Sequence, residues 1–410
     1  MFWRTTRVSR LTFVILALLG LLFIAVIELS FHTVRARWFD EKLEASKLAE
    51  RAQKTLWTYI SSSHIPVDTI ADPNATGLIG SQFTLITTDQ GVLEAKLTTT
   101  NPNWAAVVVD MLKTAGVKKG DYVAISYTGS MPGLNIAVLA AVQTIGAIPV
   151  IISSVGASMW GATNPELSWL DMERILFERG IFKYRSTAAS IGGRGDRGAN
   201  LSPKGREICR EIIKRNGVTL IEEPTLIDAI KKRVEIYMEK IPKDKKYNAY
   251  INVGGGLASI GSAHNLSVLK PGVIKRLPRF NYPIRGAMII FGLSGVPIIN
   301  LTSVTELARK YGLPIAPQPI PDVPSGDVFY KKKYRLQVVA LLLLIYALVV
   351  FVVLRIDVKK YLSRFRAVGN EIEINNISGP RWHFSNAFRV DSNQVSGCGG
   401  KMHRLQNMCA

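Results

Sequence analysis

The chain has 410 residues, of which 48% are hydrophobic, and it carries a formal net charge of +20. This length allows one large domain or two ordinary ones, and the positive charge favours anionic partners such as phospholipid head groups or an acidic polymer. Three cysteines exclude a disulfide scaffold. The sequence also contains no helix-turn-helix, zinc-finger or RNA-recognition pattern, so we expect no nucleic acid partner.

The N-terminal segment predicts a membrane anchor. Arg4, Arg7 and Arg10 precede an apolar run, and about 20 such residues are enough to span a bilayer. No small-residue cleavage site follows the run. We therefore interpret residues 11–31 as an uncleaved signal anchor behind a cytoplasmic segment, residues 1–10, with a cleaved signal peptide as the alternative.

Residues 32–66 predict a helical stalk after the anchor. Apolar side chains recur there among Glu and Lys at the spacing of one helix face, at Leu43, Leu48, Ala52, Leu56, Tyr59 and Ile60. An α/β domain, residues 67–330, is expected to follow.

The α/β domain is organised around a β-α-β pattern. The runs Tyr122–Ser126 and Ile148–Ile152 predict buried strands, and residues 134–145 predict a helix between Pro132 and Gly146. Two continuously apolar strands joined by a helix indicate a mostly parallel, doubly wound sheet covered on both faces. We expect this sheet in a soluble domain between two transmembrane helices.

Further elements extend the pattern. Helices are predicted after Asn101 and after Asn164, and over residues 203–216, 224–240 and 300–312. Strands are predicted over residues 247–253 and 287–291, and after the last of these helices.

Residues 185–206 combine five glycines with five basic residues and predict a mobile basic loop. Its cations would attract the carboxylates of an acidic polymer; they are Arg185, Arg194, Arg197, Lys204 and Arg206.

A second apolar segment, residues 336–354, is also long enough to span a bilayer. Two spans place both termini on one side, and the basic N-terminal flank favours the cytoplasm for them. We therefore expect a two-pass protein of the cell membrane with an extracytoplasmic α/β domain. Residues 355–410 predict a basic, disordered tail.

Small and hydroxyl residues follow the predicted strands. Ligands of parallel sheets bind beyond the carboxyl ends of the strands, where turns and helix starts present backbone N–H groups to an anion. The candidate ligand-binding residues are Thr128, Gly129, Ser130, Ser153, Ser154, Gly254, Gly255, Gly256 and Ser294. No Walker loop or zinc-ligand spacing occurs, and the glycines at 254–261 match a dinucleotide fingerprint only loosely, so neither a cofactor nor a metal is predicted.

Ser130 is the candidate nucleophile. It lies in Thr128-Gly129-Ser130-Met131-Pro132, which lacks both glycines of a nucleophile elbow. A serine nucleophile needs a base, and His264 is the histidine of the α/β domain that is available for that role. The sequence does not place the two together.

Three stretches carry a family resemblance: SYTGSMPGLNIAVLAA, IISSVGASMWGATNPELSWLDME and INVGGGLASIG. With the two apolar segments, they make residues 1–365 resemble the bacterial poly-γ-glutamate system protein family, membrane proteins encoded with components of poly-γ-glutamate capsule synthesis. The resemblance implies a role beside the poly-γ-glutamate ligase and its membrane partner, and supplies no catalytic residues. The chain lacks the ATP-binding loop expected of the ligase itself.

Three functions follow as hypotheses. The first is a membrane-anchored accessory subunit of poly-γ-glutamate synthesis or export, which binds the polymer or the synthase subunits. The second is a hydrolase or transferase acting on that polymer. The third is a membrane-tethered sensor of a small carboxylate or phosphate.

Overall fold

The computed structural model describes residues 10–353. They fall into two compact units, one made of residues 10–30 and 335–353 and the other of Phe31–Tyr334. The predicted tail, residues 355–410, and most of the predicted cytoplasmic segment, residues 1–9, lie outside the described residues.

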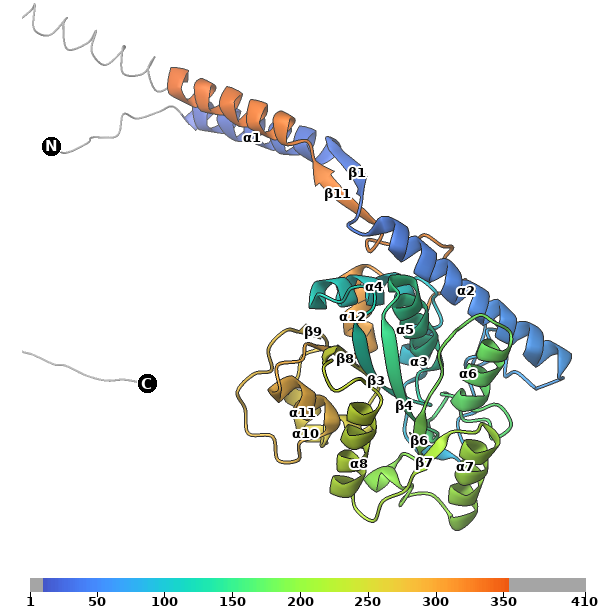
Figure 1. Cartoon of the computed structure of the whole chain (residues 1–410). Helices are drawn as coiled ribbons and strands as arrows, with labels where there is room; N and C mark the ends of the chain where they lie inside the picture. Colours follow the sequence, from blue (N-terminus) through green and yellow to red (C-terminus); the bar gives the residue numbers. More distant parts are fainter. Residues whose placement is uncertain (1–9, 354–410) are drawn as a thin grey trace, which may run out of the picture. The chain divides into compact units, whose positions relative to one another are not determined.

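A seven-stranded sheet forms the centre of the larger unit (Figure 1). Its strands lie in the order β7-β6-β4-β3-β8-β10-β9, and all neighbours are parallel except β9, which pairs antiparallel to β10 at the edge. The strands are β3 (Tyr122–Thr128), β4 (Ile148–Ser154), β6 (Ala188–Ser190), β7 (Thr219–Ile221), β8 (Tyr247–Val253), β9 (Gly272–Ile274) and β10 (Ile298–Leu301). The mostly parallel sheet of an α/β protein is thereby confirmed.

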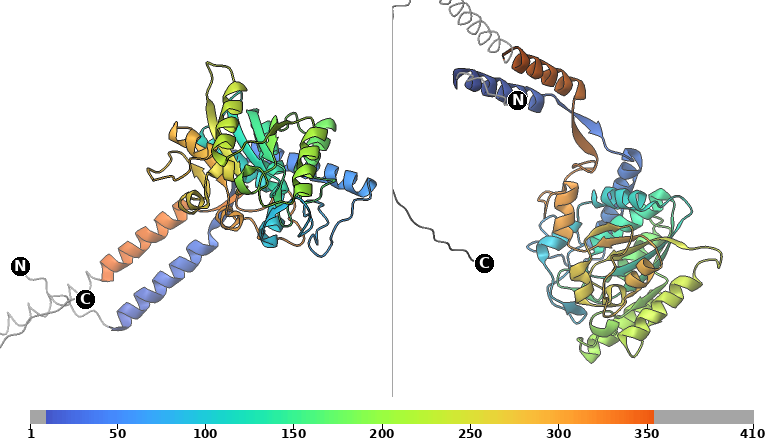
Figure 2. Two further views of the ribbon diagram at one scale, coloured as in Figure 1. Left: turned by 90° about the horizontal axis from the view of Figure 1, so that it is seen from below. Right: turned by 90° about the vertical axis from the view of Figure 1, so that its left-hand side faces the viewer.

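Helices cover both faces of this sheet (Figure 2). Successive side chains of a strand point to opposite faces, so Val123 and Ile125 enter one core while Ala124 enters the other. The first face is covered by α2 (Phe39–Ser62), α4 (Trp104–Ala115), α5 (Pro132–Ile145), α6 (Trp169–Glu178), α7 (Pro203–Arg215) and α12 (Val304–Tyr311). The second face is covered by α8 (Leu226–Glu239), α9 (Leu257–Ile260), α10 (Ala263–Val268) and α11 (Ala287–Leu293).

The predicted stalk is a core helix instead. Its apolar stripe exists as expected, but Ala45, Ala49, Ala52 and Leu56 are buried, and α2 packs against α4 and α5. The small side chains allow close packing on α5, which is itself almost entirely buried. The domain boundary near residue 66 was therefore wrong, because a stripe of this kind fits a stalk and a core helix equally well.

Two short ribbons lie outside the main sheet. Strand β1 (Phe31–Arg35) pairs antiparallel with β11 (Tyr330–Tyr334), so that Phe31 lies opposite Tyr334. Strand β2 (Thr87–Asp89) pairs parallel with β5 (Ala157–Ser158). Neither was predicted, because each strand is short and its partner is distant in the sequence.

The predicted strand at residues 287–291 is a helix, α11, that begins after Gly286. A short apolar run fits a buried helix as well as a buried strand, and periodicity alone does not separate them. The true strand is β10, and residues 312–329, beyond α12, form no strand. The predicted mobile loop is also ordered in this structure, since it contains β6, the 3-10 turn η1 (Arg194–Asp196) and the start of α7.

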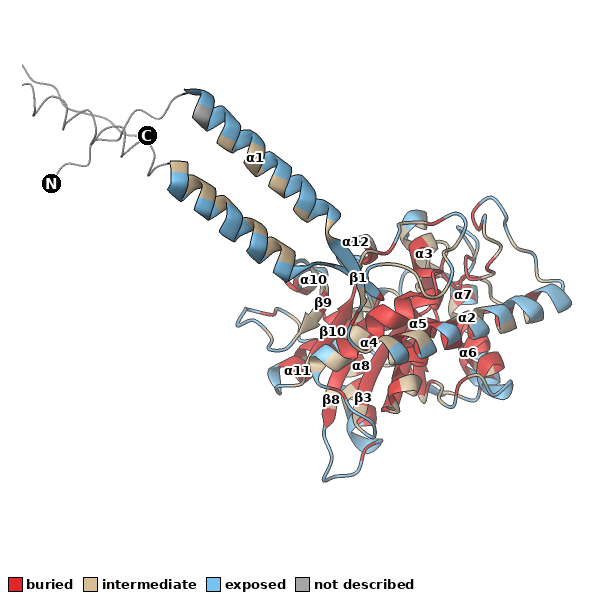
Figure 3. Cartoon of the chain, turned by 90° about the horizontal axis from the view of Figure 1, so that it is seen from above, coloured by how far each residue is buried: buried red, intermediate tan, exposed pale blue. Residues whose placement is uncertain are grey.

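The smaller unit contains two exposed apolar helices (Figure 3). Helix Leu336–Val353 is long and apolar enough to cross a membrane, whereas the apolar part of α1 (Arg10–Leu29) is the shorter run Phe13–Leu29. The two helices contact each other within the unit. The rings of Phe23 and Tyr346 meet edge to face with centroids 6.1 Å apart.

Gly133 sets the distance between α5 and the end of α3 (Leu93–Thr99). A Cβ added there would lie 2.3 Å from the backbone oxygen of Thr99. We expect Gly133→Ala to lower the free energy of unfolding by about 1–3 kcal/mol, because the helix must shift. Urea denaturation in detergent micelles measures it. Gly255→Ala, whose added Cβ meets no atom within 4 Å, is the control, and equal losses in both variants would contradict the explanation.

Candidate functional site

The strand order places a crevice between β3 and β8. From β3 the chain builds outward through β4, β6 and β7, and then returns to add β8 on the other side of β3. The loops after β3 and β8 consequently leave in opposite directions. Such a switch point, at the carboxyl ends of the strands, is where ligands of open α/β sheets bind.

A cleft of about 580 Å³ occupies this position. The segments that follow β3, β4, β6 and β8 all contribute to its wall, as do the end of β2 and parts of α9 and α10. The residues that line it include Thr128, Ser130, Ser154, Ser158, Arg194 and Gly255. The volume lies in the range of ligand-binding pockets, about 300–1,000 Å³.

Most of the predicted ligand-binding residues meet in this cleft. Thr128, Ser130, Ser154 and the three glycines 254–256 line it. Gly129 lies in the turn after β3 and packs closely against neighbouring backbone, since an added Cβ would lie 2.6 Å from the backbone oxygen of Val155. The sequence placed these residues together because the carboxyl ends of parallel strands share one edge.

Ser153 and Ser294 lie elsewhere. Ser153 points to the other face of the sheet, where its Oγ lies 2.6 Å from Ser186 Oγ. Ser294 follows α11 rather than a strand, and it lines a different pocket of about 480 Å³ with Tyr247 and Pro297, at the amino edge of the sheet. Because residues 287–291 were predicted as a strand, Ser294 was expected at the carboxyl edge of the sheet, and that prediction was wrong.

The structure does not bring Ser130 and His264 together as a hydrogen-bonded pair. His264 is exposed on α10, and its ring packs on Phe280 with centroids 5.7 Å apart. Ser130 Oγ instead accepts a hydrogen bond of 3.0 Å from the Ser158 N–H. His264 therefore does not stand as the base for Ser130 in this structure.

The five predicted cations do not form one patch. Arg194 lines the cleft, and Arg197 and Lys204 are exposed nearby in the chain. Arg206 donates to the Leu201 oxygen at 2.7 Å. Arg185, which precedes β6, donates to the Asn216 oxygen at 3.1 Å and so belongs to the amino edge. Asp89 and Asp196 also line the cleft, and their negative charges offset the positive charge of Arg194.

A buried polar layer lies beneath the cleft. The Arg233 guanidinium reaches from α8 and donates to both oxygens of Asp196 at 3.0 Å and to Ser190 Oγ at 2.7 Å. Both charged side chains are almost fully buried, and Arg233 Nη1 has no partner among the described residues. Local sequence patterns do not indicate this pair, because Asp196 lies in the segment that they predict as a mobile loop.

Lys96 is the second feature that the sequence did not indicate. Its side chain is buried on α3, and Nζ donates to the Ser130 backbone oxygen at 2.5 Å and to Ser158 Oγ at 2.7 Å. Burial lowers the pKa of Lys96 to about 7, because removal from water disfavours the charged amine. This lysine meets two serine residues of the cleft from behind its wall.

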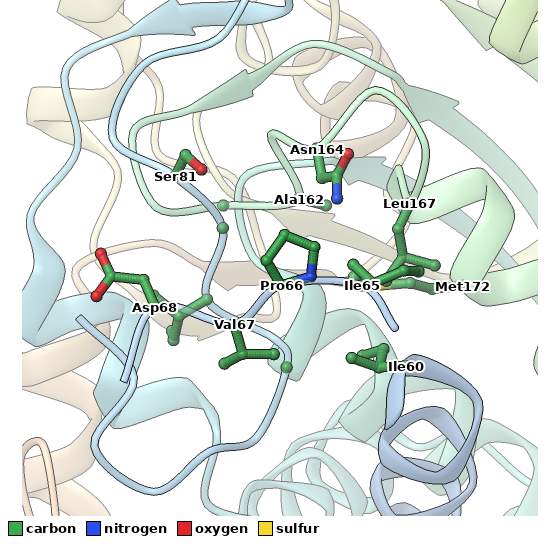
Figure 4. A pocket seen from close by; sticks show the side chains of 14 residues that line it. Ile60, Ile65, Pro66, Val67, Asp68, Ser81, Ala162, Asn164, Leu167 and Met172 are labelled. Carbon is green, nitrogen blue, oxygen red and sulfur yellow. The ribbon is translucent and has the colours of Figure 1, made fainter. Parts of the chain in front are cut away.

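A further pocket lies between the end of α2 and the segment around residue 162 (Figure 4). Its volume is only about 50 Å³, and Ile60, Val67 and Leu167 are among the residues that line it. A volume of that size holds a water molecule or two rather than a ligand. The carboxyl-edge cleft is therefore the better candidate for function.

Comparisons of the chain with protein-family models, with curated proteins and with solved structures find no match. Within residues 10–353, no group of three or more His, Cys, Asp or Glu side chains is arranged to hold a metal ion.

Proposed function

We propose that this chain is a membrane-anchored accessory subunit of poly-γ-glutamate synthesis or export. Its α/β unit binds the acidic polymer, or the synthase subunits that carry it, through the carboxyl-edge cleft. The observation that carries the proposal is the convergence of four strand ends on one cleft of about 580 Å³ with Arg194 at its wall. The resemblance of residues 1–365 to the poly-γ-glutamate system proteins supplies the identity of the polymer.

The charge distribution supports an anionic ligand. Asp196 is neutralised by Arg233, which leaves Arg194 and Asp89 as the remaining charged groups of the wall. The Asp89 carboxylate accepts a hydrogen bond from the Gln90 N–H at 2.8 Å. Arg197 and Lys204 are exposed and follow Arg194 closely in the chain, and the net charge of +20 of the whole chain favours anionic partners in general.

A two-pass arrangement belongs to the same proposal. Helix α1 has 20 residues, about 30 Å at 1.5 Å per residue, which matches the hydrocarbon core of a bilayer. It packs on helix Leu336–Val353, where the Tyr346 hydroxyl donates to the Leu16 oxygen at 3.4 Å. The β1–β11 ribbon brings Phe31 opposite Tyr334, so the chain enters and leaves the α/β unit at one place. We propose cytoplasmic termini and an extracytoplasmic α/β unit.

A bulky side chain at Gly255 tests the cleft directly. Gly255 lines the cleft, and an added Cβ meets no atom within 4 Å, so Gly255→Trp fills the space without disturbing the core. We expect it to weaken binding of fluorescent poly-γ-glutamate to the full-length protein, in nanodiscs of neutral lipid, at least tenfold. Gly255→Ala is the matched control and keeps the affinity. Equal affinity in all three proteins would refute the cleft as the binding site.

The contribution of positive charge to polymer binding can be measured separately from the filling of the cleft. Arg194→Glu should reduce the affinity and flatten its dependence on salt, since surface attraction is screened at high ionic strength. Lys240→Glu makes the same change of charge at the exposed end of α8 and should have the smaller effect. Competition by free glutamate or inorganic phosphate at equal carboxylate or phosphate concentration would instead identify a sensor of a small anion.

A further inference from the structure

Two buried lysines of the α/β unit differ in their partners. Lys42 forms an ion pair with Asp110 at 2.6 Å, which is how buried cations are normally stabilised. Lys96 is buried to the same degree, yet it forms no ion pair among the described residues, and burial is the sole cause of its pKa shift. An unpaired buried ammonium is costly, so this position beside the cleft favours the neutral amine, which can act as a base.

The partner of this amine is a serine that lines the cleft. Ser158 lies on the short strand β5, half-buried, with its Oγ 2.7 Å from Lys96 Nζ. The Lys96 Nζ also donates to the Ser130 backbone oxygen at 2.5 Å, which fixes its direction. Ser158 is held from the other side, because its N–H donates to Ser130 Oγ at 3.0 Å. A hydroxyl, a base in contact with it and a group that orients the base are the parts of an activated nucleophile.

We propose that Ser158 is a nucleophile and Lys96 its general base, and that the pair transfers acyl groups from amide bonds of an acidic chain. The choice of an acidic polyamide rests on the function proposed above, whereas the pairing of the two residues rests on their geometry. Ser130, the candidate from the sequence, is a positioning residue in this arrangement, since its Oγ and its backbone oxygen hold Ser158 and Lys96.

The reaction balances with these groups and water. Ser158 Oγ gives its proton to neutral Lys96 Nζ and forms a bond to the amide carbon of the substrate. The carbon–nitrogen bond then breaks, and the leaving amine takes the proton from the Lys96 ammonium, which leaves an ester on Ser158. Water gives a proton to Lys96 and attacks the ester carbon, and Ser158 Oγ recovers that proton as it leaves. An amine from a second chain in place of water gives transfer instead of hydrolysis.

The surroundings of Lys96 set the pH range. Its Nζ meets Ser130 and Ser158, and the β2–β5 pairing places the carboxylate residue Asp89 opposite Ser158. With a pKa of about 7, the amine is largely neutral above pH 7 and charged below it. Nucleophilic reactivity of Ser158 should therefore rise with pH through about 7.

A fluorophosphonate probe tests the pair without the polymer, since it reacts with activated serine hydroxyls. The full-length protein in neutral nanodiscs is labelled between pH 5.5 and 9, and the modified serine is mapped by mass spectrometry. We expect labelling at Ser158 that increases through pH 7. It should fall at least about 100-fold in Ser158→Ala and in Lys96→Met. Ser294→Ala, outside the cleft, is the control.

The labelled serine and the effect of Lys96→Met decide whether Ser158 and Lys96 act as nucleophile and base. Labelling at Ser130 instead of Ser158, or an equal rate in Lys96→Met, overturns the assignment. Melting temperatures check folding, and Lys96→Met should keep or gain stability because it removes an unpaired buried amine. Polymer length and polymer binding are followed in the same samples. Binding without labelling or cleavage overturns the acyl-transfer inference and leaves the binding function standing. Labelling without binding supports the pair and overturns the polymer as its substrate.

Discussion

Replacement of Arg233 by methionine should lower the free energy of unfolding by about 3–5 kcal/mol, the cost of breaking a buried ion pair by removing one partner. Arg233 joins α8 to the carboxyl edge of the sheet through Asp196, Ser190 and Ser154. In Arg233→Met, the Asp196 carboxylate remains buried and keeps only the hydrogen bond of 2.8 Å from Ser190 Oγ among these side chains. The uncompensated Asp196 charge is only 3% exposed where it lines the cleft, so solvent relieves little of the penalty.

An exposed arginine provides the matched control for this prediction. Arg210 on α7 binds both oxygens of Glu222, at 2.7 and 2.9 Å, but these side chains are partly exposed to water. Arg210→Met should cost less than about 1 kcal/mol, because solvent screens surface pairs. Urea denaturation of the two variants in micelles at pH 7 compares them. In addition, Arg233→Met with Asp196→Asn should recover part of the loss, since the uncompensated charge is gone. Equal effects of the two arginine replacements would contradict the buried-pair explanation.

Glu173→Gln should stabilise the protein in a manner that depends on pH. Glu173 is buried on α6, where burial raises the pKa of its carboxyl from 4.5 to about 7, partly offset by hydrogen bonds from the Ser186 N–H at 2.8 Å and Ser186 Oγ at 3.2 Å. The unfolded chain releases this proton near pH 4.5, whereas the folded chain holds it until about pH 7. Stability is therefore lost as pH rises through this window and stays low above it.

The glutamine variant removes this titration and keeps an acceptor for Ser186. We expect a gain of about 1–3 kcal/mol over the wild type at pH 8 and no gain at pH 4. Comparison of variant and wild type at each pH cancels the contribution of other groups such as Lys96. Glu178→Gln at the exposed end of the same helix should change stability by less than about 0.5 kcal/mol at either pH. A gain that is independent of pH would exclude the raised pKa as its cause.

Local sequence patterns predict some of the residues that form the cleft and miss others. The strands around Ile125 and Ile151 and the glycines after β8 were predictable, because a buried parallel strand is continuously apolar and its carboxyl end needs a tight turn. Lys96 and Ser158 were not, because they belong to a short helix and a two-residue strand that carry no periodic signal. Their pairing depends on where the β2–β5 ribbon closes.

The sequence by itself determined most of the longer helices and strands and the burial of both faces of the sheet. Alternation within strands and unbroken apolar runs fix which residues must leave water, and this fixed the helix-covered parallel sheet and most of the residues at its carboxyl edge. Only the tertiary structure decided what depends on contacts between distant segments. It placed α2 in the core, made residues 287–293 a helix, and joined Arg233 to Asp196 and Lys96 to Ser158. The physical reason is that burial and electrostatic pairing depend on distances in space, which the order of residues along one segment does not encode.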